Sequence, residues 1–588
     1  MNSVLRLFDV PYHQLRNFPK EDMFNTKVDG TWVSLSTKDF LNQAMNLTKG
    51  LMHLGVKRGD RIAVASTNRY EWNVLDIAVQ QAGAILVPLY PTISSNDYAF
   101  ILKDCAAKFM FVGNQEISDK ISEVRTSIST LEEVYAFDAI DGVKSWTNIA
   151  MLETGITDEE VSKRMDAVLD TDMVTIIYTS GTTGNPKGVM LSHRNVLSNV
   201  LACEEPIPAD QHSKVLTFLP VCHIYERMLH YLYMYIGASI YFAESMDTIG
   251  DNIREVKPDV FSAVPRLIEK VYDRIIAKGE DLSGIKRKLF FWAVSLAERY
   301  EHNGKGFMFY LQLRIARKLI FSKWKEALGG NVRAIASGSA ALQPRLARIF
   351  YAAGIPILEG YGLTETSPVV SVNSFTKGVV FGSVGALIDG VEVKLAEDGE
   401  IWVKGPNVML GYYNNLEATN EVLDADGWFK TGDIGTFVQD KYLKITDRKK
   451  EMFKTSGGKY VVPQAIENSL KESRFIEQAM VLGENQKFPA AFLVPDFAFI
   501  KTWSIKEGKS MDTLSNQEII SDELVISAIR KEVDRVNANL GNWEQIKKFE
   551  LLSNLFSIEG NELTPTLKLK RKVILGKYQS QFDKIYSE

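Results

Sequence analysis

The chain has 588 residues, of which 45% are hydrophobic and 24% are charged. These proportions are typical of folded proteins, and the length exceeds what one hydrophobic core usually supports, so we expect several domains. The formal net charge of −5 provides no overall positive field, which argues against nucleic acid as a partner.

Targeting signals and disulfides are not expected. The first residues, MNSVLRLFDVPYHQLRNFPKED, place charges and a proline before any apolar segment of signal length. Three scattered cysteines are too few for a disulfide framework or a paired-cysteine zinc site. We therefore predict a cytoplasmic protein.

Residues 61 to 113 alternate between strand-like and helix-like segments. Residues 61–66, 84–90 and 108–113 are apolar and β-rich, whereas 71–83 and 94–105 have helical periodicity. Gly83 is placed to end the first helix, and Ser94 or Ser95 to cap the second. The pattern predicts βαβ units and a mostly parallel sheet, and thus the α/β class. Further buried strands are predicted at 214–220, 238–243, 258–264, 332–339 and 356–362.

The most apolar stretch, residues 228–242, is too short to span a bilayer and contains a histidine and a glycine. We interpret it as core or as the wall of a pocket. The helix-like segment 306–328 mixes aromatic residues with arginines and lysines. It fits either an ordinary amphipathic helix that covers the core or a helix that lies on a membrane surface.

The pattern changes twice in the last third of the chain. After about Gly382, short strands and turns predict a small antiparallel β subdomain. After Asp447, the segments predict a compact α+β unit with a basic tail. We therefore expect a large N-terminal domain over 1–447, with the β subdomain at about 382–447, and a small C-terminal domain over 448–588.

The segment 175–189, TIIYTSGTTGNPKGV, has the composition of a polyphosphate-binding loop. Glycines allow successive backbone N–H groups to turn toward one anion, hydroxyls add donors, and Lys187 supplies a positive charge. A P-loop requires a lysine directly after its last glycine, but here Asn185 and Pro186 intervene. The spacing therefore disfavours a P-loop kinase or ATPase.

The same segment resembles the signature of the adenylate-forming superfamily, which includes acyl-CoA synthetases, luciferases and nonribosomal peptide adenylation domains. Five further segments resemble the motifs of that superfamily in the same order: LPVCHIYER (219–227), ILEGYGLTET (357–366), WFKTGD (428–433), TDRKKEMFKTSGGKYVVPQAIE (446–467) and LTPTLKLKR (563–571). The resemblance implies the adenylate-forming fold, with a large N-terminal domain and a mobile C-terminal domain. It also implies a two-step reaction, in which a carboxylate attacks the α-phosphate of ATP and a thiol then displaces AMP.

The resemblance assigns roles in the large domain. The β- and γ-phosphates are expected to contact Thr179, Ser180, Gly181, Thr182, Thr183, Gly184 and Lys187. Thr364 is expected to contact the α-phosphate, and Glu365 to coordinate Mg²⁺, which prefers oxygen ligands. Tyr361 is expected to stack on adenine beside Gly362, with Gly338, Ser339 and Ala340 along the other edge. His223 is expected near the carboxylate of the acid, with a structural histidine as the alternative.

Further roles fall after residue 428. Asp433 is expected to accept hydrogen bonds from both ribose hydroxyls, and Arg448 to add a ribose or phosphate contact beside it. Lys450 aligns with the hinge, and Gly457 and Gly458 with the loop that approaches the adenylate and CoA. Lys568 aligns with the lysine that promotes adenylation; TPTLK departs from the commoner form with Ser-Gly before this lysine, and Lys570 is the alternative.

The class of carboxylic acid substrate is inferred from the sequence around and after His223. Residues 230–242 and 257–275 resemble the long-chain fatty acyl-CoA synthetase branch, and no charge there indicates a polar acid. We predict an ATP- and Mg²⁺-dependent long-chain fatty acid–CoA ligase, whose partners are the fatty acid, ATP and CoA, with peripheral contact to the inner membrane surface as an open expectation. The alternatives are transfer of another acyl group or transfer to a carrier protein, and a noncatalytic acyl- or nucleotide-binding homologue. The sequence does not indicate an oligomeric state.

Overall fold

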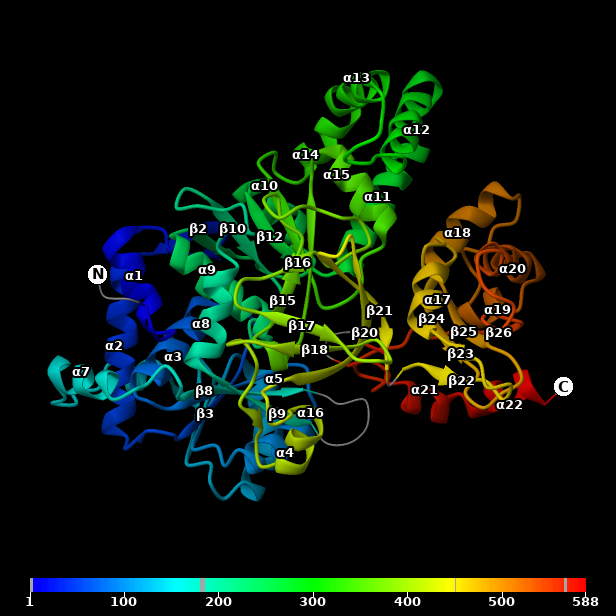
Figure 1. Cartoon of the computed structure of the whole chain (residues 1–588). Coiled ribbons are helices and arrows are strands. Elements are labelled where there is room, and N and C mark those ends of the chain that lie inside the picture. The colour runs from blue at the N-terminus through cyan, green and yellow to red at the C-terminus, as the bar shows by residue number, and fades with distance from the viewer. Residues whose placement is uncertain (1–3, 180–185, 450, 565–567, 588) are drawn as a thin grey trace. The chain divides into compact units, whose positions relative to one another are not determined.

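A computed structural model describes residues 4–179, 186–449, 451–564 and 568–587 (Figure 1). The chain forms two compact units. Unit 1 comprises Met1–Lys394, Trp402–Thr431 and Phe437–Lys444, and unit 2 comprises Leu395–Ile401, Gly432–Thr436 and Ile445–Glu588. The border is therefore crossed several times between residues 394 and 445.

The first sheet of unit 1 has eight strands in the order β19-β9-β8-β4-β3-β5-β6-β7. The strands are β3 (Arg61–Ala65), β4 (Ile85–Leu89), β5 (Phe109–Val112), β6 (Glu133–Ala136), β7 (Lys144–Ser145), β8 (Met173–Thr179), β9 (Lys187–Ser192) and β19 (Gly411–Tyr412). From β8 through β7 the neighbouring strands run parallel, whereas β9 and β19 are antiparallel additions at one edge. The parallel part confirms the predicted βαβ units.

The helices between these strands also confirm the sequence pattern. α3 (Tyr70–Gln81) is followed by Gly83 with a φ of 72°, and α4 (Ser95–Asp104) begins after Ser94. The Ser94 hydroxyl accepts a hydrogen bond from the Asp97 N–H, and the Asp97 carboxylate accepts one from the Ser94 N–H. This reciprocal pair satisfies two N–H groups that a helix start would otherwise leave open.

The second sheet has thirteen strands in the order β17-β18-β20-β21-β16-β15-β14-β13-β12-β10-β11-β1-β2. Its strands are β1 (Phe24–Val28), β2 (Thr31–Leu35), β10 (Lys214–Thr217), β11 (Ser239–Phe242), β12 (Val260–Ala263), β13 (Ala334–Ser337), β14 (Ile357–Gly362), β15 (Val369–Val372), β16 (Ala386–Leu387), β17 (Glu392–Leu395), β18 (Glu400–Lys404), β20 (Phe429–Val438) and β21 (Tyr442–Arg448). Within this sheet, neighbouring strands in the series β1, β11, β10, β12, β13 and β14 are parallel. The five strands predicted in this region are confirmed. The pairs β14–β15, β15–β16 and β16–β21 are antiparallel, and the short strands predicted after Gly382 extend this sheet.

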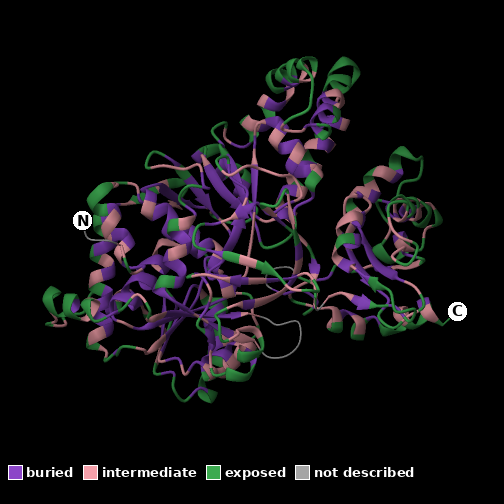
Figure 2. Cartoon of the chain, viewed as in Figure 1, coloured by how far each residue is buried: buried purple, intermediate pink, exposed green. Residues whose placement is uncertain are grey.

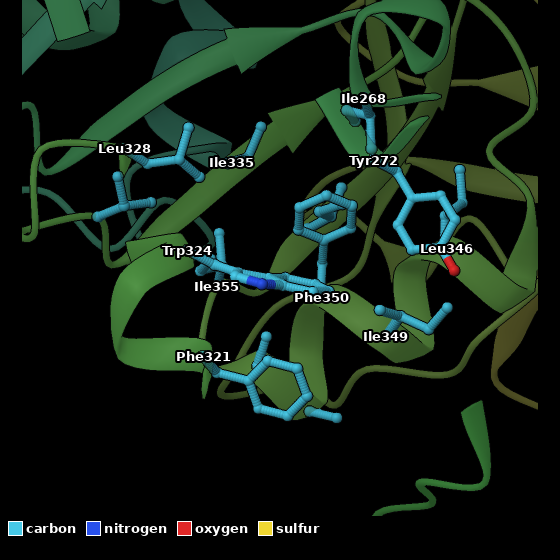
Figure 3. Close-up of a cluster of buried hydrophobic side chains, with 14 of the residues drawn as sticks. Ile268, Tyr272, Phe321, Trp324, Leu328, Ile335, Leu346, Ile349, Phe350 and Ile355 are labelled. Carbon is cyan, nitrogen blue, oxygen red and sulfur yellow. The ribbon is translucent and has the colours of Figure 1, made fainter. Parts of the chain in front are cut away.

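The remaining helices up to residue 422 belong to unit 1. They include α1 (Asp9–Asn17), α2 (Thr37–His53), α5 (Gln115–Val124), α6 (Thr147–Ala150), α7 (Asp158–Asp166), α8 (His193–Ala202), α9 (Ile224–Ile236), α10 (Ile249–Val256), α11 (Pro265–Glu280), α12 (Gly284–Glu298), α13 (Phe307–Ala316), α14 (Ser322–Ala327), α15 (Pro344–Ala353) and α16 (Leu416–Val422). α9 is buried along nearly its whole length (Figure 2), which confirms that the apolar stretch 228–242 belongs to the core. Phe350 of α15 lies with Phe321 and Trp324 in a buried hydrophobic cluster (Figure 3). Among the described residues, no helix combines the length and the apolar character needed to cross a membrane.

Unit 2 contains a three-stranded sheet of β24 (Ile476–Leu482), β25 (Ala490–Pro495) and β26 (Lys548–Leu551). β24 and β25 are antiparallel, and β26 joins β25 in parallel. The helices are α17 (Pro463–Leu470), α18 (Phe497–Lys506), α19 (Asn516–Ile520), α20 (Glu523–Asn537), α21 (Arg571–Lys577) and α22 (Gln579–Tyr586). A separate hairpin consists of β22 (Phe453–Lys454) and β23 (Tyr460–Val461).

Candidate active site

Thr179 and Lys187 lie opposite each other at the ends of the antiparallel strands β8 and β9. The Thr179 hydroxyl donates to the Lys187 carbonyl at 3.5 Å. The pairing brings the two ends of the predicted phosphate loop together. The intervening candidates, Ser180, Gly181, Thr182, Thr183 and Gly184, lie outside the described residues.

Tyr412 connects Lys187 to the predicted metal ligand. The Lys187 ammonium nitrogen lies 5.0 Å from the centroid of the Tyr412 ring, and the Tyr412 hydroxyl donates to Glu365 Oε1 at 2.9 Å. Burial, followed by the negative charge of Glu365, raises the pKa of Tyr412, which keeps the phenol protonated as a donor. One aromatic side chain therefore contacts a cation with its ring and a carboxylate with its hydroxyl.

Strand pairing positions this tyrosine. β19 pairs with β9, so that Tyr412 lies opposite Val189. The Met409 N–H donates to the Glu365 carbonyl at 2.9 Å and fixes the backbone of the acidic residue against the same segment. Sequence reasoning missed Tyr412, because a tyrosine beside glycine in GYYNN is more often a packing residue.

Glu365 and Thr364 lie in a short 3₁₀ turn, Thr364–Thr366, that follows β14. Thr364 is buried, and Glu365 is half-buried. Within the described part of the chain, no cluster of three or more histidine, cysteine, aspartate or glutamate side chains could hold a metal on its own. A single carboxylate nevertheless fits Mg²⁺, which is usually bound by one or two carboxylates together with substrate phosphates.

The predicted adenine segments follow neighbouring parallel strands. Gly338 and Ser339 come directly after β13, and Tyr361 lies in β14, so these residues share the carboxyl edge of the sheet. Ala340 follows them in the same loop, in which Ser339 has a φ of 70°. Tyr361 pairs with Ser371 and is half-buried.

Gly338 and Gly362 differ in how much space their surroundings leave for a side chain. A methyl group on Gly338 would make only ordinary contacts, 3.7 Å from the Gly360 carbonyl oxygen and from the Tyr225 ring. A methyl group on Gly362 would lie 1.7 Å from the carbonyl oxygen of Pro368. Gly362 is therefore required by backbone packing.

His223 caps the buried helix α9. Its Nδ1 accepts a hydrogen bond from the Tyr225 N–H at 3.2 Å, so a neutral ring carries its proton on Nε2. The N-terminus of a helix favours negative charge. Half-buried His223 thus combines a capping role with a position suited to a carboxylate.

The charged side chains of α9 are engaged inside the protein. Glu226 accepts hydrogen bonds from the Thr217 and Ser262 hydroxyls at 2.5 and 2.6 Å, and burial raises the pKa of Glu226 to about 7. Arg227 pairs with Asp76 at 2.5 Å, with both side chains buried. These residues, which follow the histidine in LPVCHIYER, anchor α9 and are not exposed to a ligand.

In unit 2, Asp433 and Arg448, both of which are predicted to contact the nucleotide, form an ion pair. Asp433 lies in β20 and Arg448 ends β21, and Arg448 Nε lies 3.0 Å from Asp433 Oδ1. The carboxylate is only 4% exposed, whereas the guanidinium is 31% exposed. The Lys449 N–H donates to the Gly432 carbonyl at 2.8 Å and holds the two segments in register.

The two candidate lysines of the C-terminal motif have different surroundings. Lys568 is exposed, and its N–H donates to the Thr564 hydroxyl at 3.0 Å, while its carbonyl accepts from the Thr564 N–H at 2.8 Å. The Lys570 ammonium donates to Asn561 Oδ1 at 2.5 Å. Backbone bonds thus fix the base of Lys568, whereas a local contact holds the end of Lys570.

Gly457 and Gly458 form the turn between β22 and β23. The Gly458 N–H donates to the Thr455 carbonyl at 2.8 Å, and Gly458 has a φ of 75°, which favours glycine. An added methyl group on Gly458 would meet open space. Backbone conformation, and not crowding, therefore accounts for this glycine. The hinge candidate Lys450 lies outside the described residues.

Comparisons with known proteins agree with this arrangement. A model of AMP-binding enzymes matches residues 12–413, and a model of the AMP-binding enzyme C-terminal domain matches residues 451–588. The chain belongs to the AMP-binding enzyme family. Within that family it is 33% identical to the long-chain-fatty-acid–CoA ligase FadD15 of Mycobacterium bovis, over 97% of this chain and 96% of that protein.

Other members of the AMP-binding enzyme family show the same breadth of similarity. The peroxisomal long chain acyl-CoA synthetase 6 of Arabidopsis thaliana is 31% identical over 100% of this chain and 87% of its own length. Among solved structures, ATP-bound MatB from Rhodopseudomonas palustris has a TM-score of 0.72 at 22% identity, and covers 98% of this chain and 99% of its own. This likeness confirms the adenylate-forming fold, and the curated relatives confirm the long-chain acyl-CoA synthetase branch.

Proposed function

We propose that the chain is an AMP-forming long-chain fatty acid–CoA ligase that consumes ATP and CoA. The observation that carries the proposal is the Lys187–Tyr412–Glu365 arrangement in a chain that matches named long-chain-fatty-acid–CoA ligases over nearly its full length. Such an enzyme converts a fatty acid and ATP to acyl-AMP and pyrophosphate, and then acyl-AMP and CoA to acyl-CoA and AMP.

Charge stabilisation is the main requirement of the first step, because negative charge shifts among the phosphate oxygens. In our proposal Lys187 and the loop that begins at Thr179 bind the β- and γ-phosphates. Glu365 holds Mg²⁺, which when bound neutralises phosphate charge, and Thr364 contacts the α-phosphate. Tyr412 fixes the carboxylate of Glu365 and supports the ammonium of Lys187.

The remaining proposed contacts are to adenine and to ribose. Tyr361 and the segment Gly338, Ser339, Ala340 bind adenine, and Asp433 with Arg448 binds ribose. The burial of the Asp433 carboxylate and its pairing with Arg448 support this role, since a fixed carboxylate can accept from two hydroxyls.

The acid is proposed to enter with its carboxylate toward His223 and its alkyl chain along apolar walls. The charged side chains of α9 have protein partners, which leaves no evident recognition group for a polar acid on that helix. We place the enzyme in the cytoplasm. The rival substrates, another acid or a carrier-bound thiol, predict the same first step and differ in the second.

One experiment separates these alternatives. The protein is incubated with ATP, Mg²⁺ and palmitate, with and without CoA, and pyrophosphate, AMP and palmitoyl-CoA are measured. Pyrophosphate release with palmitate followed by palmitoyl-CoA with CoA supports the ligase. Release without palmitoyl-CoA favours a carrier acceptor, and no release across a series of chain lengths contradicts the proposed substrate.

Lys568→Ala and Lys570→Ala form a matched pair in the same assay. We propose Lys568 as the group that orients the attacking carboxylate, because its place in LTPTLKLKR aligns with the adenylation lysine of the family and the residue is exposed. Lys568→Ala should lose the first step but retain thioester formation from supplied palmitoyl-AMP. The opposite ranking of the two variants would reassign the role to Lys570.

A further inference from the structure

Lys568 lies in a loop of unit 2 whose two sides are paired with each other. The Thr564 N–H donates to the Lys568 carbonyl at 2.8 Å, and the Lys570 N–H donates to the Glu562 carbonyl at 2.8 Å. We call residues 562–570 the lysine loop. Its base consists of Glu562 on one side and Lys570 on the other, so the orientation of Lys568 depends on how this base is held.

The first side of the base is fixed by the Glu562 side chain, which is buried. Glu562 Oε2 accepts a hydrogen bond from the Ser557 N–H at 3.0 Å, and Oε1 accepts one from the Lys577 ammonium. The second side continues directly into Arg571, the first residue of α21. Arg571 is therefore placed to fix the other side of the base.

The guanidinium of Arg571 joins the lysine loop to a helix and a strand of unit 2. Nη2 donates to both carboxylate oxygens of Glu467 at 2.8 and 2.9 Å, and Nη1 donates to the Val481 carbonyl at 3.2 Å. The Val481 N–H in turn donates to Glu467 Oε1 at 2.7 Å. Glu467 lies in α17 and Val481 in β24, which pack side by side (Figure 1). These charge-assisted bonds have fixed geometry, because the guanidinium is planar.

Arg571 also faces the residues that flank the hinge candidate Lys450. Its Nη2 lies 3.7 Å from Glu451 Oε2, and Glu451 directly follows Lys450 in the chain. Burial raises the pKa of the Asp447 carboxyl to about 6, and the positive charge of Arg571 acts against this rise. Arg571 thus lies between the lysine loop and the segment in which the hinge is expected.

We propose that Arg571 is a positioning residue for adenylation, which fixes the base of the lysine loop and thereby the reach of Lys568 toward the attacking carboxylate. The inference rests on the proposed function. A displacement of roughly 1 Å at a reacting group can lower a rate about 100-fold, so an exposed lysine on a loop needs a fixed base. The second step does not use Lys568, and Arg571 should therefore affect the first step alone.

The test uses Arg571→Met/Glu467→Gln, because loss of the guanidinium alone would leave a buried carboxylate without its partner. Palmitate-dependent exchange of pyrophosphate into ATP should fall about tenfold or more, while thioester formation from supplied palmitoyl-AMP and CoA should stay within about threefold. The matched control is Arg535→Met/Glu532→Gln, which removes a partly exposed ion pair of 3.0 Å in α20 of the same unit. Both steps should stay within about twofold in this control.

A double-mutant cycle separates positioning from a structural role. Arg571→Met/Glu467→Gln is repeated in a Lys568→Ala background, and the remaining exchange of pyrophosphate is measured. The further change should be less than about twofold, because a residue that acts through Lys568 has nothing left to position. A second tenfold loss in this background would show that Arg571 acts independently of Lys568 and would overturn the proposal.

Hydrogen exchange of the lysine loop provides a readout that needs no catalysis. Without substrates, the Lys570 N–H should exchange about tenfold or more faster in Arg571→Met/Glu467→Gln than in the wild type, while exchange in α20 should be unchanged. If the wild type is inactive but the exchange of the loop still increases in the variant, the ligase is refuted and the anchoring by Arg571 is retained.

Two further results would overturn the proposal. One is an equal loss of both steps in Arg571→Met/Glu467→Gln, which would show that the substitutions disrupt unit 2 as a whole. The other is an active wild type whose adenylation rate and loop exchange are unchanged in this variant, which would show that Arg571 does not hold the loop.

Discussion

Replacing Tyr412 by phenylalanine tests whether the link between Lys187 and Glu365 contributes to adenylation. The substitution keeps the ring beneath the ammonium and removes only the hydroxyl that donates to Glu365 at 2.9 Å. A hydrogen bond to a charged group contributes about 1.5–3 kcal/mol. Because Glu365 is half-buried and water can replace part of the bond, we take the lower end.

At about 1.4 kcal/mol for each factor of ten, this loss predicts a decrease of roughly tenfold in kcat/KM for adenylation. The assay is palmitate-dependent exchange of pyrophosphate into ATP at several Mg²⁺ concentrations. The decrease should be largest at low Mg²⁺, where a misplaced carboxylate cannot be compensated by mass action.

Tyr442→Phe is the matched control, because it removes a hydroxyl that donates to the Lys377 carbonyl at 2.9 Å in the same unit. Its exchange rate should stay within about twofold of the wild type. Equal rates for Tyr412→Phe and Tyr442→Phe at every Mg²⁺ concentration would refute the role given to Tyr412.

Three further predictions concern single residues. Gly362→Ala should lower the free energy of unfolding in urea by about 2 kcal/mol or more, because its methyl group would clash with the Pro368 carbonyl, whereas Gly250→Ala, with open space in α10, should not destabilise. Asp433→Asn should weaken ATP binding by about tenfold, as measured by calorimetry. The control Asp398→Asn, which breaks a half-exposed ion pair with Lys449, should have little effect on ATP binding. Equal losses of affinity in the two variants would contradict the ribose role of Asp433. Burial raises the pKa of Glu226 from 4.5 to about 7, so the folded protein binds more protons than the unfolded chain between these values and loses stability as pH rises through them. Glu226→Gln should remove about 2–3 kcal/mol of this loss between pH 5 and 8, and identical pH profiles of unfolding for variant and wild type would show that Glu226 does not titrate in this range.

The parallel part of the fold could be predicted because each strand carries its own signal. Segments such as 61–66 and 332–339 are short, apolar and separated by helical periodicity, and buried parallel strands have this composition. The cap at Ser94 is equally local, since the serine and Asp97 are three residues apart. Local rules therefore recover these elements without tertiary information.

The parts that sequence missed depend on distant contacts. Tyr412 reaches Glu365 across 47 positions through the pairing of β19 with β9, which no local periodicity reveals. The segment 306–328 is periodic enough to predict a helix, but the structure divides it into α13, a π-helical turn over Arg317–Phe321 and α14. The 79% exposure of Phe307 likewise depends on where the core ends, and composition alone does not fix that.

In the proposed reaction, a carboxylate of a fatty acid attacks the α-phosphate of ATP, and CoA then displaces AMP. Palmitate labelled with ¹⁸O in both carboxylate oxygens, incubated with ATP, Mg²⁺ and CoA, tests it directly. The attacking oxygen forms the bond to phosphorus and leaves with AMP when the thiol attacks the carbonyl carbon. Attack by the carboxylate therefore places one labelled oxygen in AMP for each palmitoyl-CoA formed. Palmitoyl-CoA accompanied by unlabelled AMP, or by ADP and labelled phosphate, would contradict it.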